Sequence, residues 1–191
     1  MAMNMLQIAE SAIDQMPLPC RFSARDGQVI LAHQEFLLGL EPQLIELFYD
    51  TLFEHPPTAE VFLEGERPAR EVTLSQWWRR TVTGPVDSGY FAWMAGVGMA
   101  HVFRAVTNPM MLAMADLIAA FVREQAFRSP LSQADAAALA EAFTRLASTV
   151  GVVISYGYGE TMSTAMSRAR VHALTESTGS EESPGPFEGD E

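Results

Sequence analysis

One histidine lies inside an apolar helical run, where its side chain could bind a cofactor. The run reads AGVGMAHVFRAVTNP, and the histidine is His101. Val97 and Gly98 lie one helical turn before it on the same side, and Met94 lies two turns before it. A glycine within a helix costs roughly 1 kcal/mol relative to alanine, so Gly96 and Gly98 indicate that something bulky, such as a flat cofactor, approaches this helix. The alternative is that both glycines allow helix–helix contact and that His101 is a hydrogen-bonded core residue.

Other residues that could do chemistry form no recognisable pattern. His33, His55 and His172 are too far apart in the sequence to predict a local metal site, and the motifs of zinc proteases, phosphate-binding loops and serine hydrolases do not occur. The glycine pair Gly96–Gly98 follows no predicted strand, so it does not indicate a dinucleotide site. Cys20 is the only cysteine, which excludes an internal disulfide and predicts a buried, inert thiol.

Composition and charge limit the partners of the chain. Its 191 residues suit a single domain, and 48% of them are hydrophobic, enough for a sizeable core. The formal net charge of −12 opposes binding to nucleic acid or to an anionic membrane. Because no uninterrupted apolar run approaches about 18 residues and the N-terminus lacks a basic leader pattern, we expect a cytoplasmic protein that does not span a membrane. Residues 171–191 are rich in Ser, Gly, Pro and acidic side chains, which predicts a disordered acidic tail.

Helical patterns follow one another along the rest of the chain, and no segment alternates apolar and polar residues over the length of a strand. We therefore predict an all-α fold with a long C-terminal helix. Asp87 or Ser88 is the expected cap of the helix that carries His101, and Asn108 followed by Pro109 is expected to begin the next helix. The predicted helices cover residues 6–15, 29–40, 43–55, 58–62, 71–82, 87–106, 110–127 and about 132–170.

The order of these helices resembles the globin family, and specifically its globin-coupled sensor and protoglobin branch. Three segments carry the resemblance: LIELFYDTLFEHP around Tyr49, LSQWWRR in the next long helix, and MAHVFRAVTNPMM around His101. Tyr49 and His101 lie 52 positions apart, close to the spacing between the distal tyrosine and the iron-binding histidine in this branch. The resemblance covers about residues 30–168. We therefore expect a sensor-globin domain over residues 1–170, in which residues 1–29 form an extension before the first globin helix.

The resemblance implies haem b as the cofactor and gives roles to individual residues. His101 is then the iron ligand, and Tyr49 is the distal hydrogen-bond donor that favours O2 over CO. Trp77 and Trp78 are adjacent on a helix, so their side chains point about 100° apart and only one of them should line the distal side; we favour Trp77. The other expected contacts of the cofactor are apolar or small: Met94, Val97, Gly98, Phe48, Phe53 and Phe62.

The sequence after the histidine departs from the usual pattern of sensor globins. Many of them read His-x-Arg-Ile-Gly, whereas this chain reads His-Val-Phe-Arg-Ala, which moves the arginine to Arg104 and removes the glycine. The contacts at the haem edge should therefore differ from that pattern. Arg79 and Arg80 could reach the haem propionates or could form an ordinary solvated helix face.

Two classes of function stay open from the sequence. The first is a haem protein that binds a diatomic gas, O2 before CO or NO, and that passes a signal to a partner protein. The second is a haem-free helical interaction module in which His101 is a core residue. Haem redox chemistry, such as dioxygenation of NO, is the only enzymatic activity with support, and we expect it as a side activity at most.

The last two helices predict a homodimer. They carry many apolar residues, and Gly151, Ser155 and Gly159 recur every four positions, which permits a second helix to approach closely. The resemblance adds that these two helices form a four-helix bundle between subunits in sensor globins. The apolar side chains expected on this surface are Val152, Ile154, Tyr156 and Tyr158.

Overall fold

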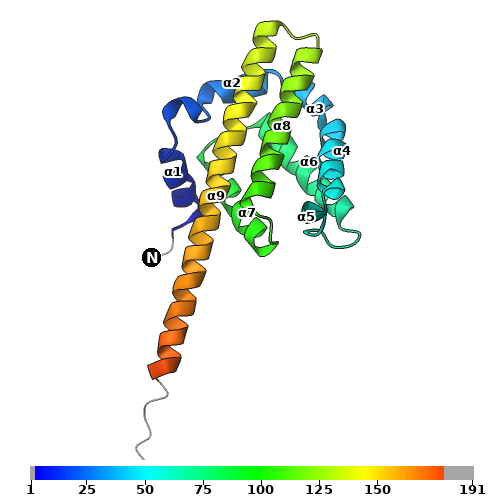
Figure 1. Ribbon diagram of the computed structural model, residues 1–191. Helices are drawn as coiled ribbons and strands as arrows, with labels where there is room; N and C mark the ends of the chain where they lie inside the picture. Colours follow the sequence, from blue (N-terminus) through cyan, green and yellow to red (C-terminus); the bar gives the residue numbers. More distant parts are fainter. Residues whose placement is uncertain (1–2, 179–191) are drawn as a thin grey trace, which may run out of the picture.

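The computed structural model describes residues 3–178, and it describes residues 161–165 and 167–178 by their backbone alone. This part of the chain forms helices and no strand, so the all-α prediction is confirmed (Figure 1). The helices are α1 (Met5–Asp14), α2 (Ala24–Ala32), α3 (Gln34–Gly39), α4 (Glu41–Glu54), α5 (Pro56–Ala59), α6 (Arg67–Thr83), α7 (Ser88–Phe103), α8 (Asn108–Arg128) and α9 (Gln133–Thr178), with a short 3-10 turn at Leu18–Cys20.

Helix α9 lies at the centre of the arrangement. It packs against α8 and α7 and also against α1 and α2 from the N-terminal extension. Helices α8 and α9 run antiparallel beside each other, and the far half of α9 projects beyond the rest of the protein (Figure 1). Helices α4 and α6 pack together, and α4 also contacts α8. The fold thus places α4 and α6 on one side of a space whose other sides are α7, α8 and α9.

Local side-chain caps explain where several helices begin. Asn4 is the N-cap of α1, and Ser23 is the N-cap of α2. In each case the side-chain oxygen accepts a hydrogen bond from the backbone N–H three residues later. Asp87 caps α7 in the same way, as predicted. The predicted cap of α8 is wrong by one residue, because the hydroxyl of Thr107 accepts from the Met110 N–H. Asn108 and Pro109 therefore occupy the first turn of α8, where proline is tolerated.

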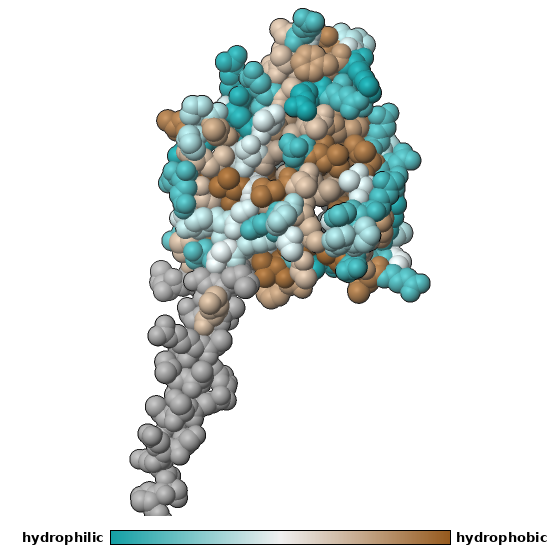
Figure 2. All heavy atoms as spheres, in the orientation of Figure 1, coloured by the Kyte–Doolittle hydropathy of each residue, from teal (hydrophilic) through white to brown (hydrophobic). Residues whose placement is uncertain are grey.

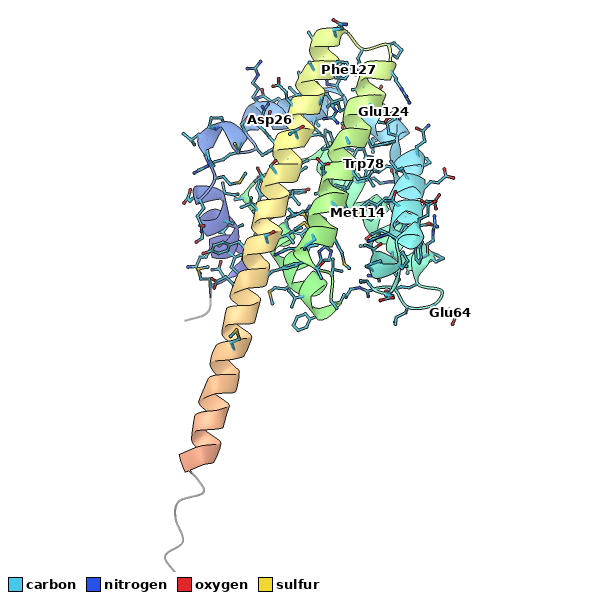
Figure 3. The ribbon with its side chains drawn as sticks, viewed as in Figure 1. Asp26, Glu64, Trp78, Met114, Glu124 and Phe127 are labelled. Atoms are coloured by element: carbon cyan, nitrogen blue, oxygen red, sulfur yellow. The ribbon has the colours of Figure 1, made fainter. Side chains whose placement is uncertain are left out.

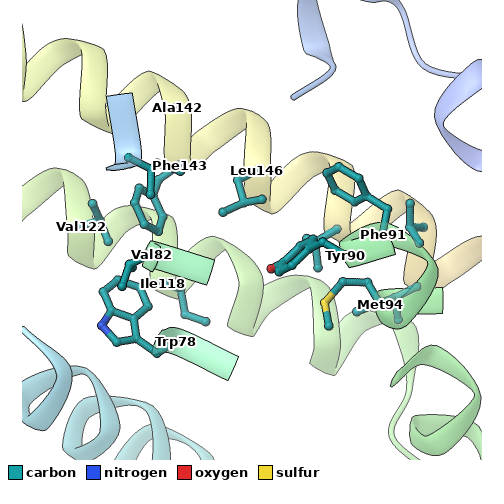
Figure 4. Packing of buried hydrophobic residues seen from close by; sticks show 14 of the residues in the cluster. Trp78, Val82, Tyr90, Phe91, Met94, Ile118, Val122, Ala142, Phe143 and Leu146 are labelled. Carbon is teal, nitrogen blue, oxygen red and sulfur yellow. The ribbon is translucent and has the colours of Figure 1, made fainter. Parts of the chain in front are cut away.

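The core joins the helices through large buried side chains. Trp78 of α6 packs against Phe143 of α9, with ring centroids 5.6 Å apart, and its indole N–H donates to the Leu37 carbonyl at 3.1 Å. Figure 4 shows Tyr90 and Met94 of α7 in the same group of buried side chains as Leu146 and Phe143 of α9. These side chains fix α6 and α7 relative to α9, so the walls of the space between them are rigidly placed.

Helices α7 and α9 cross at glycines. A Cβ atom on Gly98 of α7 would lie 2.8 Å from the carbonyl oxygen of Ile154 and 3.2 Å from its Cα. On the partner helix, a Cβ atom on Gly157 would lie 3.2 Å from the carbonyl oxygen of Ala95. Only glycine fits at such a close backbone approach without a shift of one helix. The crossing therefore sets the position of α7 against α9.

A buried ion pair fastens the N-terminal extension to α9. The carboxylate of Asp26, which is labelled on α2 in Figure 3, is buried. It accepts hydrogen bonds from Nη2 and Nε of Arg145 at 2.6 Å and 3.0 Å and from the Ser23 hydroxyl at 2.7 Å. Burial by itself raises the pKa of Asp26, but the hydrogen bonds from Arg145 and Ser23 lower it more, so the net pKa lies below the usual 3.8. Asp26 is therefore ionised and paired at neutral pH.

The end of α9 and the single cysteine differ from expectation. Helix α9 continues to Thr178 instead of ending near Arg170, so the first part of the predicted acidic tail is helical, and residues 179–191 lie outside the described residues. By length and composition, Gln133–Glu160 could cross a membrane, and 56% of its most apolar window is buried against the protein, as in the core helix of a globular domain.

Cys20 is exposed rather than buried, because it lies in the 3-10 turn after α1.

Candidate functional site

A cavity of about 350 Å³ lies among the helices α4, α6, α7, α8 and α9. Side chains of α4 and α6 form one wall, and side chains of α7, α8 and α9 form the other. The buried core consists of two groups of residues, a small one that contains Tyr49, Leu74 and Met114, and a large one that contains Met94 and Phe143. Members of both groups line the cavity, so it separates the two parts of the core. Its mostly apolar lining suits a flat apolar ligand.

His101 lies in the last turn of α7 and lines this cavity. The helix ends just after it because Ala105 adopts a positive φ of 59°, and the Val106 N–H donates to the His101 carbonyl at 3.0 Å. The Nδ1 atom of His101 is buried and has no hydrogen-bond partner among the described residues. Burial, and after it the positive charge of Arg104, lowers the pKa of His101 below its usual 6.5. The imidazole is therefore neutral at pH 7, which is the form that binds a metal ion.

Tyr49 belongs to the other wall and is only 4% exposed. Its ring meets the rings of Phe48 and Phe62 edge-on, with centroids 5.3 Å and 6.1 Å away. All three side chains line the cavity. Burial raises the pKa of the Tyr49 hydroxyl far above its usual 10, so the group stays protonated and can donate a hydrogen bond.

The structure separates the two adjacent tryptophans. Trp77 lines the cavity, whereas Trp78 is fully buried in the core on the other side of α6. Trp77 was the residue favoured from the sequence for the distal side. Phe53, a weaker candidate, is partly exposed, and its ring stacks on Phe62 from outside the cavity, with centroids 5.0 Å apart.

Gly98 is the expected contact that the structure corrects. Met94, Val97 and His101 of α7 line the cavity, but Gly98 faces the backbone of α9 at Ile154. The glycine is required there by the close crossing of two helices and not by a cofactor. Sequence inspection could not separate these two reasons, because the approaching backbone comes from a segment more than fifty positions away in the chain.

A charged cluster at the cavity was missed by the sequence analysis. Arg70 and Arg104 both line the cavity, and Glu66 pairs with each of them, at 3.3 Å to Nε of Arg70 and 2.6 Å to Nη2 of Arg104. Of the two arginines considered from the sequence, Arg79 pairs with Glu41 and Arg80 lies over the Trp93 ring. The only sequence signal for the cluster was the displaced arginine of the His-Val-Phe-Arg pattern.

These residues fit a haem group. The walls are apolar and aromatic, one wall offers a neutral imidazole, and two arginines at the cavity can face carboxylates. Among the residues whose side chains the structure describes, no three His, Cys, Asp or Glu side chains come together as a metal site made by protein ligands alone. An iron bound at His101 would therefore need other ligands, which a porphyrin supplies.

Comparison with known proteins gives one result. A model of the Protoglobin family matches residues 9–161, which include every residue of the cavity described above. A search of curated proteins finds no match.

Proposed function

This chain belongs to the protoglobin family, and we propose that it holds haem b and binds a diatomic gas at the haem iron. The family implies haem binding. The observation that carries the proposal here is the neutral His101 imidazole in the wall of an apolar cavity that also contains the protonated hydroxyl of Tyr49.

Each lining residue has a definite part in this proposal. Haem would supply an iron atom that can bind both the His101 imidazole and a small gas. His101 binds through its neutral imidazole, and Phe48 and Trp77 exclude water from the opposite wall. Arg70 and Arg104 both pair with the carboxylate of Glu66. Their positive charge can bind the haem carboxylates in the same way.

We propose O2 as the preferred gas, ahead of CO and NO, because of Tyr49. A phenol hydroxyl donates a hydrogen bond, and such a bond strengthens when the acceptor carries negative charge. At a haem site, dioxygen is a better hydrogen-bond acceptor than carbon monoxide, so the Tyr49 hydroxyl would favour dioxygen. Leu52, Leu74, Met114 and Phe62 pack around Tyr49, and their side chains donate no hydrogen bond.

The experiment that tests haem binding is an absorption titration of the haem-free protein with haem. We expect a ferrous spectrum of a histidine-ligated haem for the wild type and for His55→Ala, whose histidine is exposed and lies outside the cavity. His101→Ala should lose that spectrum and recover it when imidazole is added. Failure of the wild type to bind haem, or an unchanged His101→Ala spectrum, would refute the proposal and favour a haem-free helical module.

We also propose that the protein acts as a gas sensor and forms a homodimer through the outer face of α8 and α9. Leu112 and Phe127 of α8 are 48% and 54% exposed, and Figure 2 shows apolar patches on this face between hydrophilic side chains. The available surface is smaller than the sequence implied. Ile154 and Tyr158 are buried in the protein's own core, and Gly151 packs against Leu112.

Sedimentation tests the dimer. At micromolar concentration the wild type should have twice the monomer mass, and Leu112→Glu on the exposed part of α8 should reduce it. Leu18→Glu is a matched control, because Leu18 is also exposed but lies near α1. A monomeric wild type at all concentrations would refute the dimer and would leave haem binding untouched.

A further inference from the structure

Tyr158 of α9 is a buried tyrosine with an unusual environment. Its side chain is 8% exposed, and its hydroxyl oxygen is buried without a hydrogen-bond partner among the described residues. A buried hydroxyl without a partner is unfavourable, and such groups in a native protein usually mark a role. The role is not explained by packing, because phenylalanine would fill the same space without the penalty.

The ring of Tyr158 faces the ring of His101. The two ring centroids are 6.4 Å apart, and the ring planes are nearly perpendicular, at 85°. The Nδ1 atom of His101 is also buried and without a partner among the described residues. Two polar groups that both lack partners therefore sit on neighbouring rings, one on α7 and one on α9.

The chemistry of the two groups is complementary. When a neutral histidine binds a metal through one nitrogen, its proton lies on the other nitrogen and needs an acceptor. A phenol oxygen is such an acceptor. Arg104 cannot serve, because a guanidinium only donates, and the Thr58 hydroxyl already donates to the backbone of its own segment.

The crossing of α7 and α9 holds the two rings in this relation. Gly98 lies against Ile154, and Gly157, the neighbour of Tyr158, lies against Ala95. Both contacts are between backbones, so they leave little freedom for α9 to slide along α7. Tyr158 therefore reaches the His101 ring from a fixed position.

We propose that Tyr158 is the positioning residue of the iron ligand: its hydroxyl accepts a hydrogen bond from the Nδ1–H of His101 when the other ring nitrogen binds haem iron. This inference rests on the proposed haem function. Neither group has a partner among the described residues, so both are available for this bond. It fixes the plane of the imidazole, increases its basicity toward iron, and links the ligand directly to the long helix α9.

The test compares Tyr158→Phe with Tyr156→Phe, a half-buried tyrosine on the same helix that does not line the cavity. We expect Tyr158→Phe to lower the iron–histidine stretching frequency in the ferrous Raman spectrum. We also expect haem to transfer to an acceptor protein about 10- to 100-fold faster, the usual effect of losing such a partner. Tyr156→Phe should match the wild type in both measurements.

Thermal unfolding of the haem-free proteins separates a positioning role from packing. Tyr158→Phe should leave the haem-free protein as stable as the wild type or more stable, because its hydroxyl has no partner in that state. An unchanged Raman frequency and transfer rate would overturn the inference while leaving haem binding through His101 intact. A wild type without haem, or one whose spectrum survives His101→Ala, would overturn both proposals.

Discussion

Alanine substitutions at Gly98 and Gly96 should change stability in opposite directions. Both glycines lie within α7 two residues apart, so each gains about 1 kcal/mol of helix propensity on replacement by alanine. A Cβ atom on Gly96 meets nothing within 4 Å. A Cβ atom on Gly98 lies 2.8 Å from the Ile154 carbonyl oxygen and 3.2 Å and 3.4 Å from two further backbone atoms of that residue.

The difference between the two variants can be estimated from these contacts. Inserting a methyl group into a closely packed site costs about 1–3 kcal/mol, and the cost is paid in full when the neighbour is backbone and cannot turn away. Gly96→Ala should therefore stabilise the protein by about 1 kcal/mol, and Gly98→Ala should lie about 1–3 kcal/mol below it. For a domain of this size, 1 kcal/mol changes the melting temperature by about 2–4 °C.

The assay is thermal unfolding of the haem-free proteins followed by circular dichroism. The expected order of melting temperature is Gly96→Ala, then wild type, then Gly98→Ala at or below the wild type, with about 2–12 °C between the two variants. Equal melting temperatures would mean that α9 does not approach Gly98 as described. If Gly98 instead contacted a cofactor, its replacement would weaken haem binding and leave the haem-free protein stable.

Three further predictions concern the cavity and the N-terminal extension. Tyr49→Phe should lose one charge-assisted hydrogen bond of about 1.5–3 kcal/mol, so O2 should dissociate about ten- to a hundredfold faster while CO dissociation hardly changes; stopped-flow measurements with both gases check this. Arg104→Leu should release haem severalfold faster, because Arg104 lines the cavity, and Arg79→Leu should not, because Arg79 binds Glu41 instead; equal rates for both would contradict the assignment. Because Asp26 has a lowered pKa in the folded protein, its stabilising effect is complete above the unfolded pKa near 3.8 and is lost as the pH falls through the lower folded pKa. Asp26→Asn should therefore unfold with about 1–3 kcal/mol less free energy at pH 7 and with a weaker dependence on acid; an unchanged pH profile in denaturant titrations would refute this.

The parts of the fold that depend on local chemistry could be predicted from the sequence. Apolar periodicity and the absence of alternating segments gave the helices, and Asp87 was identified as a cap by its residue type and place. Thr107 was missed because both it and Asn108 are good caps, and only the backbone angles select between them. The end of α9 was placed too early because a polar composition does not by itself stop a helix.

In the candidate site, too, some residues could be predicted from the sequence and others could not. Tyr49, Trp77 and His101 were predicted from segments that resemble globins, and the structure places all three in one cavity. The role of Gly98 depended on which helix passes it, and the ion pairs of Glu66 join residues far apart in the chain. Neither leaves a short-range pattern, so neither can be identified from spacing alone.

The placement of α9 connects these observations. The same helix lines the cavity through Leu146 and Ile154, holds the N-terminal extension through Arg145, and presents Tyr158 to His101. Because the contact of α7 with α9 is backbone against backbone at Gly98, no flexible side chain lies between them to absorb a movement. A displacement of the His101 helix toward α9 would therefore press directly on the α9 backbone, which continues beyond the rest of the protein (Figure 1).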